Sequence, residues 1–113
     1  ITDVTKVDIN NKFWAINYFW PGDKKRLQPS QDLILTKHKE GVSHSQSEIV
    51  ERLIQFKIEK NQILLTNEKP IQLELDDKNS RNWEGVAKLE DKGFIIATDK
   101  YPKMILAFVK HHL

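Results

Sequence analysis

Three oxygen-bearing side chains are the best candidates for a chemical site in this sequence. They are the carboxylates of Glu84 and Asp99 and the amide of Asn17. Calcium takes roughly six to eight oxygen ligands, so we expect a calcium ion there if the three lie together. Such an ion would polarise an ester and activate a water molecule for hydrolysis. The alternative is that Glu84 and Asp99 cap turns or pair with Lys100 and Arg81 at the surface.

Histidine is the second possible source of chemistry. His38 and His44 lie in a charged, turn-rich stretch, where His44 is the candidate general acid or base and simple solvation is the alternative. His111 and His112 are adjacent, so in an extended chain they point in opposite directions and make a poor chelate. The basic residues 24–26 suit a phosphate ester or a solvated surface.

The composition, and the absence of several known catalytic motifs, argue against several classes of protein. The sequence has no G-x-S-x-G, Walker loop or H-E-x-x-H motif. Its 18 basic and 16 acidic residues give a charge of +2, too balanced to indicate nucleic-acid binding. No apolar run approaches the roughly 18 residues of a membrane helix, and the absence of cysteine excludes disulfides. Because the chain begins at Ile1 and its one methionine is Met104, we expect Ile1 to lie inside a longer polypeptide.

The same short segment occurs twice in the 113 residues. The matched pairs are residues 6–8 with 88–90, residues 13–17 with 94–98, and residues 52–56 with 104–108. The offset is 82 before the turn (88 − 6) and 81 after it (94 − 13), so the two turns differ by one residue. A unit that recurs at this scale indicates a repeat architecture.

The elements that must position these residues are predicted to be short strands. We expect strands over residues 4–9, 13–19, 51–58, 62–66, 71–75, 86–90, 93–99 and 103–110. Ser45 and Glu48 resemble a helical capping box, but the matching segment of the second copy is too short and apolar for an amphipathic helix. We therefore interpret residues 51–58 as a strand and residues 22–50 as a loop inserted in the first copy.

Repeated units of short antiparallel strands are typical of β-propeller blades. We therefore predict an all-β fold made of two consecutive four-stranded-type antiparallel blades of an incomplete β-propeller. The first blade spans residues 1–75 and the second residues 82–113, together forming a C-terminal fragment. Two blades alone leave wide apolar faces open, so we expect the remaining blades of the parent chain, or other copies, as partners. The alternative is a β-sandwich or barrel of about seven strands.

A family resemblance lies in the second copy. Residues 81–89 and 93–100 resemble the N-x-E-G-hydrophobic and G-hydrophobic-x-x-x-[ST]-D elements of the phytase-like esterase β-propellers, and residues 13–23 resemble a penultimate blade of these proteins. Members are bacterial, mostly uncharacterised and often exported. The Glu-Gly element at Glu84 is also similar to calcium-dependent lactonase-type propellers, in which a glutamate at that position binds a divalent metal.

This resemblance implies a function for the full-length protein. It implies metal-assisted hydrolysis of a phosphate or carboxylate ester, with Glu84, Asn17 and Asp99 as calcium ligands, in a periplasmic or secreted protein. The alternative is a non-catalytic propeller that binds a peptide, glycan or envelope partner through the stretch between Trp20 and Glu51.

Overall fold

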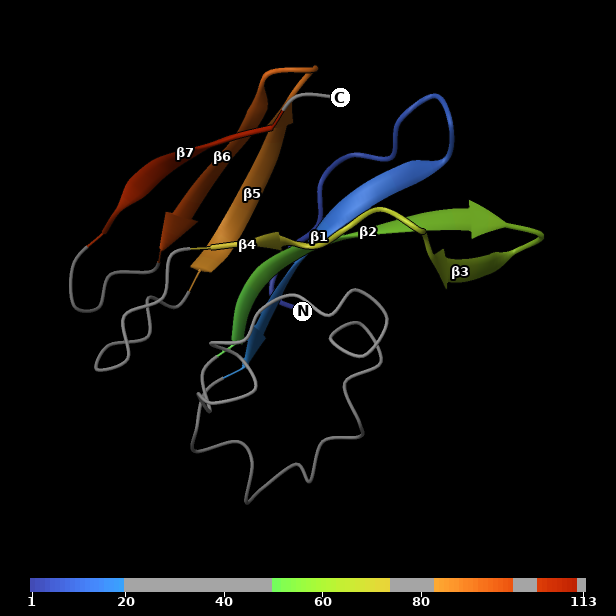
Figure 1. The fold of residues 1–113 in the computed structure, drawn as a ribbon, viewed down its shortest axis with the longest axis horizontal. Helices are drawn as coiled ribbons and strands as arrows, with labels where there is room; N and C mark the ends of the chain where they lie inside the picture. The colour runs from blue at the N-terminus through green and yellow to red at the C-terminus, as the bar shows by residue number, and fades with distance from the viewer. Residues whose placement is uncertain (20–49, 74–82, 99–103, 112–113) are drawn as a thin grey trace.

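The protein is all-β in the part of the chain that the structure describes. A computed structural model describes residues 1–19, 50–73, 83–98 and 104–111, and within them every regular element is a strand (Figure 1). The strands form two antiparallel sheets, as the sequence predicts. The first sheet contains β1 (Lys12–Phe19), β2 (Val50–Glu59), β3 (Gln62–Leu65) and β4 (Ile71–Gln72). The second sheet contains β5 (Trp83–Leu89), β6 (Gly93–Thr98) and β7 (Leu106–Lys110).

The first sheet is centred on the pairing of β1 with β2, which confirms the predicted strand over residues 51–58. β3 and β4 both pair with the far edge of β2, opposite residues 56–59 and 52–53 respectively. The two short strands therefore share one edge and do not form two successive rows. Pro70 lies in the break between them, as expected of a residue that cannot donate to a ladder.

The β2–β3 hairpin closes through a two-residue turn. Lys60 and Asn61 both have positive φ, at 51° and 64°. This is the type I′ geometry that matches the twist of the flanking strands. This turn connects the two segments that were predicted as strands over residues 51–58 and 62–66.

Residues 1–8 form an N-terminal limb that runs alongside β1. The N–H of Thr5 donates to the carbonyl of Trp14 at 2.8 Å, and the N–H of Ile16 donates to the carbonyl of Asp3 at 2.9 Å. Only an isolated bridge, between Val4 and Ala15, is regular. The predicted first hairpin is therefore present, but its first arm is irregular.

The second sheet follows the order β5-β6-β7. Its β5–β6 hairpin is present as predicted, but β5 begins at Trp83 and not at residue 86, and β7 begins at Leu106 and not at residue 103. The pairing of β5 shifts between Trp83 and Gly85, which places a bulge at Glu84.

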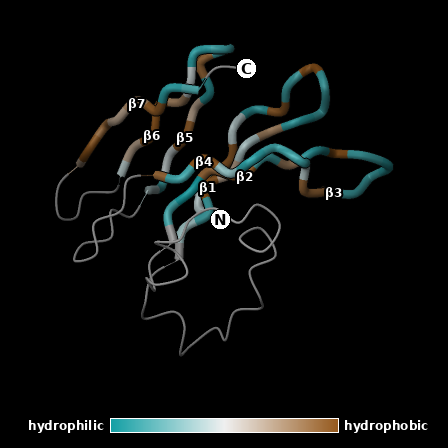
Figure 2. The backbone as a smooth tube through the Cα atoms, viewed as in Figure 1, coloured by the Kyte–Doolittle hydropathy of each residue, from teal (hydrophilic) through white to brown (hydrophobic). Residues whose placement is uncertain are grey.

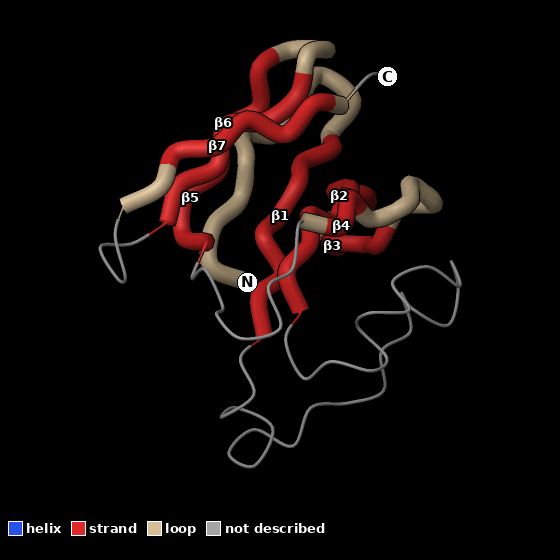
Figure 3. Tube along the Cα trace, turned by 60° about the vertical axis from the view of Figure 1, so that its left-hand side comes forward, coloured by secondary structure: helices blue, strands red, loops and turns tan. Residues whose placement is uncertain are grey.

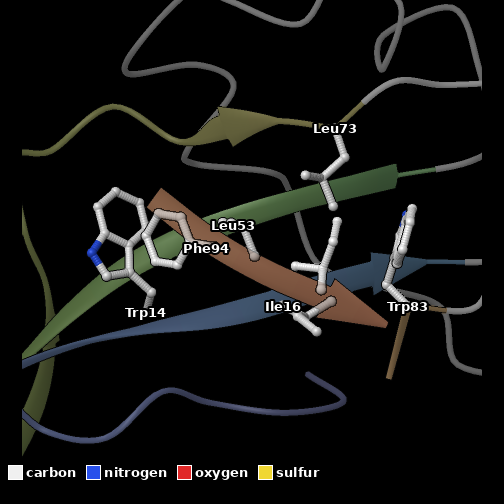
Figure 4. Packing of buried hydrophobic residues seen from close by; sticks show 7 residues of the cluster. Trp14, Ile16, Leu53, Leu73, Trp83 and Phe94 are labelled. Carbon is white, nitrogen blue, oxygen red and sulfur yellow. The ribbon is translucent and has the colours of Figure 1, made fainter. Parts of the chain in front are cut away.

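The two sheets share one hydrophobic core. Its buried members are Trp14, Ile16, Leu53 and Leu73 from the first sheet side and Trp83, Phe94 and Ile96 from the second (Figure 4). The rings of Trp14 and Phe94 meet edge to face, with their centroids 5.2 Å apart. Aromatic pairs favour this geometry because a ring edge meets the electron-rich face of its neighbour.

Candidate functional site

The structure describes two of the three predicted metal ligands, Asn17 and Glu84. The side-chain oxygen of Asn17 accepts a hydrogen bond from Nε of Arg52 at 2.7 Å. Glu84 is exposed at the bulge of β5, and Asp99 lies outside the described residues. Among the described residues, no three His, Cys, Asp or Glu side chains lie together as metal ligands would. The calcium site remains a prediction.

The predicted histidines have different outcomes. His38, His44 and the basic residues 24–26 lie outside the described residues, as does His112. His111 packs against the aromatic core, with its ring 5.3 Å from that of Trp14 and 5.9 Å from that of Phe94. The contacts that place His111 are therefore packing contacts.

A different feature stands out on the second sheet, which is apolar on both faces. The pairing of Val86 with Ile96 and of Phe94 with Val109 places these residues on one face, toward the first sheet. We call this the inner face. The opposite, outer face carries Gly85, Ala87 and Leu89 of β5, Gly93, Ile95 and Ala97 of β6, and Leu106, Phe108 and Lys110 of β7.

The outer face is exposed along β7, whereas its residues on β6 are half-buried or buried. Leu106 is 72% exposed and Phe108 55% exposed, and Met104 just before β7 is 76% exposed. The hydropathy colouring shows apolar residues along β7 at the outside of the molecule (Figure 2). Large contiguous apolar surfaces on folded proteins often mark binding sites. The outer face is therefore the candidate functional site.

The internal repeat shows what the outer face corresponds to in the first sheet. The Val4–Ala15 bridge matches the Val86–Ile96 pair, with offsets of 82 (86 − 4) and 81 (96 − 15), as the sequence comparison predicts. At the same offset of 81, Trp14 and Ile16 of the first sheet correspond to Ile95 and Ala97 of the outer face. Trp14 and Ile16 are buried against the second sheet. The outer face is thus the counterpart of a face that is covered in the first sheet.

The inner face of the second sheet also has a counterpart in the first sheet, and it lies on the side of the first sheet away from the core. Phe94 corresponds to Phe13, yet Phe94 points toward the first sheet whereas Phe13 lies on the face of β1 opposite Trp14. The two units are therefore stacked head to tail, with one kind of face against the other. This arrangement is heterologous and does not close on itself after two units.

The predicted alignment of residues 52–56 with 104–108 is wrong by one residue. Phe13 pairs with Phe56 and Phe94 pairs with Val109, so the structural offset is 53 (109 − 56), whereas the sequence alignment gave 52 (104 − 52). A shift of one residue moves every side chain to the opposite face of a strand. The counterpart of Leu53 is therefore Leu106, on the outer face.

Side chains of the N-terminal limb join the two units at β5. The hydroxyl of Thr2 donates to the carbonyl of Trp83 at 2.6 Å, and the N–H of Val86 donates to a carboxylate oxygen of Asp3 at 2.9 Å. The limb therefore runs between β5 and β1 (Figure 3) and in the same direction as β5. Because Asp3 is the counterpart of Gly85, equivalent segments of the two units lie side by side.

Comparison of the chain with protein-family models, curated proteins and solved structures gave no match. The resemblance to phytase-like esterases, the hydrolase activity and the periplasmic or secreted location therefore remain predictions. In the described residues, no helix is long and apolar enough to cross a membrane.

Proposed function

We propose that this chain contributes two repeat units to a β-propeller, and that it acts as a binding module whose outer face receives a further apolar β-sheet. The observation that carries the proposal is the exposure of Leu106 and Phe108 on a face whose counterpart is covered in the first sheet. Fully burying a side chain of this size contributes about 1.5 to 3 kcal/mol, so covering the outer face is favourable.

Head-to-tail stacking supports the propeller over the sandwich. Seven strands in two sheets around one core suit both architectures. A sandwich built from two copies facing each other would bury Phe13 and Phe94 together between the sheets. Instead, Phe13 and Phe94 lie on faces that point the same way along the stack, as in repeats related by rotation about a common axis. The parallel course of the N-terminal limb and β5 fits the same relation.

The proposal also specifies the sheet that should fit on the outer face. The first unit is covered by an inner face that carries Val86, Phe94 and Ile96. A third unit with the same kind of inner face would extend the stack without a new type of contact, because each repeat interacts mainly with its neighbours. The occupant of the outer face is therefore another sheet of the same repeat type.

The test is to supply that sheet. We would append a second copy of residues 74–113 after Leu113 and measure unfolding in urea. If the added sheet covers the outer face, we expect the free energy of unfolding to rise by about 2 kcal/mol or more, with a larger m-value from the extra buried surface.

Matched variants identify the contact surface. Phe108→Asp in the receiving sheet should abolish the gain, because it places a charge under the added sheet. Ile9→Asp should preserve the gain, because Ile9 is already 96% exposed and lies in the turn between the N-terminal limb and β1. The proposal would be contradicted if the chain with the appended copy unfolded with the original free energy and m-value. It would also be contradicted if Phe108→Asp and Ile9→Asp changed the gain in stability equally.

A further inference from the structure

The edge of β7 is a second feature, distinct from the outer face. β7 lies at the end of the order β5-β6-β7, and no described strand pairs with its far edge. The N–H of Thr98 donates to the carbonyl of Ile105, and the N–H of His111 donates to the carbonyl of Lys92. Since alternate residues of an antiparallel strand bond to the same side, the backbone groups of Leu106, Phe108 and Lys110 point away from β6.

The first sheet shows how the corresponding edge is satisfied. β2 is the counterpart of β7, and its far edge carries β3 and β4, both antiparallel to it. The backbone of β4 reaches β2 through the pair Leu53–Ile71, and Leu53 is the counterpart of Leu106. β7 presents the same kind of edge without a described strand beside it. Such an edge is a template for an added strand.

The side chains along β7 determine which strand would fit. Leu106 and Phe108 are apolar and exposed, and Lys110 adds a positive charge at the C-terminal end of the strand. Residues directly opposite each other in an antiparallel pair interact most strongly, and opposite charges are favourable there. Because the added strand runs antiparallel, its first residue lies opposite Lys110 and its fifth opposite Leu106.

We propose that the edge of β7 binds an extended peptide segment of another protein as a fourth, antiparallel strand. Read from its N-terminus, the segment carries an acidic residue opposite Lys110, an aliphatic residue opposite Phe108 and another opposite Leu106. The intervening residues point toward the inner face. This inference goes beyond the proposed function, because it concerns the backbone edge of one strand and not the outer face of the sheet.

The experiment uses a blocked peptide, Thr-Glu-Thr-Ile-Thr-Leu-Thr, titrated into the isotope-labelled chain and followed by nuclear magnetic resonance. The amide signals of Leu106, Phe108 and Lys110 should shift saturably. These amides should also exchange with solvent at about one tenth of their rate in the free chain, or more slowly. The amides of Ala107 and Val109 should keep their exchange rates, because they point toward β6. This alternation distinguishes strand addition from binding on the outer face.

A charge exchange provides the matched control. A peptide with lysine in place of glutamate should bind the natural chain at least about threefold more weakly, and the Lys110→Glu variant should reverse that preference. Lys110 is exposed, so this variant should keep the fold. Absence of saturable shifts at about 5 mM peptide, or protection without the alternation, would overturn the inference. Equal binding of both peptides would overturn the acidic specificity.

Discussion

Position 93 tolerates only glycine because of its neighbours on β7. Gly93 has a φ of 151°, and a Cβ atom placed there would collide with the carbonyl oxygen of Val109 and lie 3.0 Å from Cζ of Phe108. The sequence predicts a strand that begins at Gly93, and Gly93 is the first residue of β6. The close approach of β7 is a tertiary feature that the turn alone does not reveal.

We predict that Gly93→Ala destabilises the protein by about 2 kcal/mol or more, because the new methyl group must displace backbone. Gly85→Ala is the matched control on the neighbouring strand, since its Cβ would meet Cβ of Ala97 at 3.7 Å, an ordinary contact. Urea unfolding of both variants checks this. Equal losses in the two variants would mean that the crowding at position 93 is relieved elsewhere.

The second residue-scale prediction concerns calcium. A binding module without a metal site should unfold at the same temperature with calcium or with a chelator. A bound ion at 100 times its dissociation constant would instead stabilise the fold by about 2.7 kcal/mol. A calcium-dependent rise in melting temperature that is lost in Glu84→Gln would support the hydrolase hypothesis and count against a purely binding role.

At the scale of the elements, local pattern predicted the strands better than their pairing. The predicted strand 51–58 is β2, and the predicted hairpin of the second copy is β5 with β6, because runs of β-branched and aromatic residues between turn residues are a local signal. The register of β7 was wrong by one residue. Leu106, Ala107, Phe108 and Val109 are apolar on both faces, so the pattern does not specify which face is which.

The β2–β3 turn offers a prediction at this scale. Asn61 has a φ of 64°, which glycine adopts without strain and β-branched residues avoid. We expect Asn61→Gly to stabilise the protein by up to about 1 kcal/mol and Asn61→Val to destabilise it by about 1 to 2 kcal/mol. Thermal unfolding of the pair measures both. A valine variant as stable as the natural protein would show that β3 contributes nothing to stability.

At the scale of the whole molecule, the contact between the two sheets forms the hydrophobic core. The sequence predicted an all-β, repeated chain with wide apolar faces. It did not reveal which face of each sheet forms the core, because that depends on how the two units stack. The hydrogen bond from Arg52 to Asn17 illustrates the same limit, because it joins two residues that are 35 positions apart in the sequence.

Trp14 gives the prediction for this scale. It is 1% exposed and touches Phe94 of the other sheet, so Trp14→Ala should cost about 3 to 5 kcal/mol. Trp14→Phe should cost less, because it keeps the aromatic contact and removes an indole N–H that has no hydrogen-bond partner among the described residues. Denaturant unfolding of the two variants tests this. A stable alanine variant would mean that the sheets are held together by other contacts.

The hydrogen bonds from Thr2 and Asp3 to β5 also constrain the order of folding. They join residues that are 81 and 83 positions apart in the sequence. During synthesis, Thr2 and Asp3 must therefore wait until Trp83 and Val86 have been made before they gain these partners. Closing so long a loop is entropically costly, and non-local contacts of this kind slow folding. The beginning of the chain should be the last part to become protected from solvent during refolding.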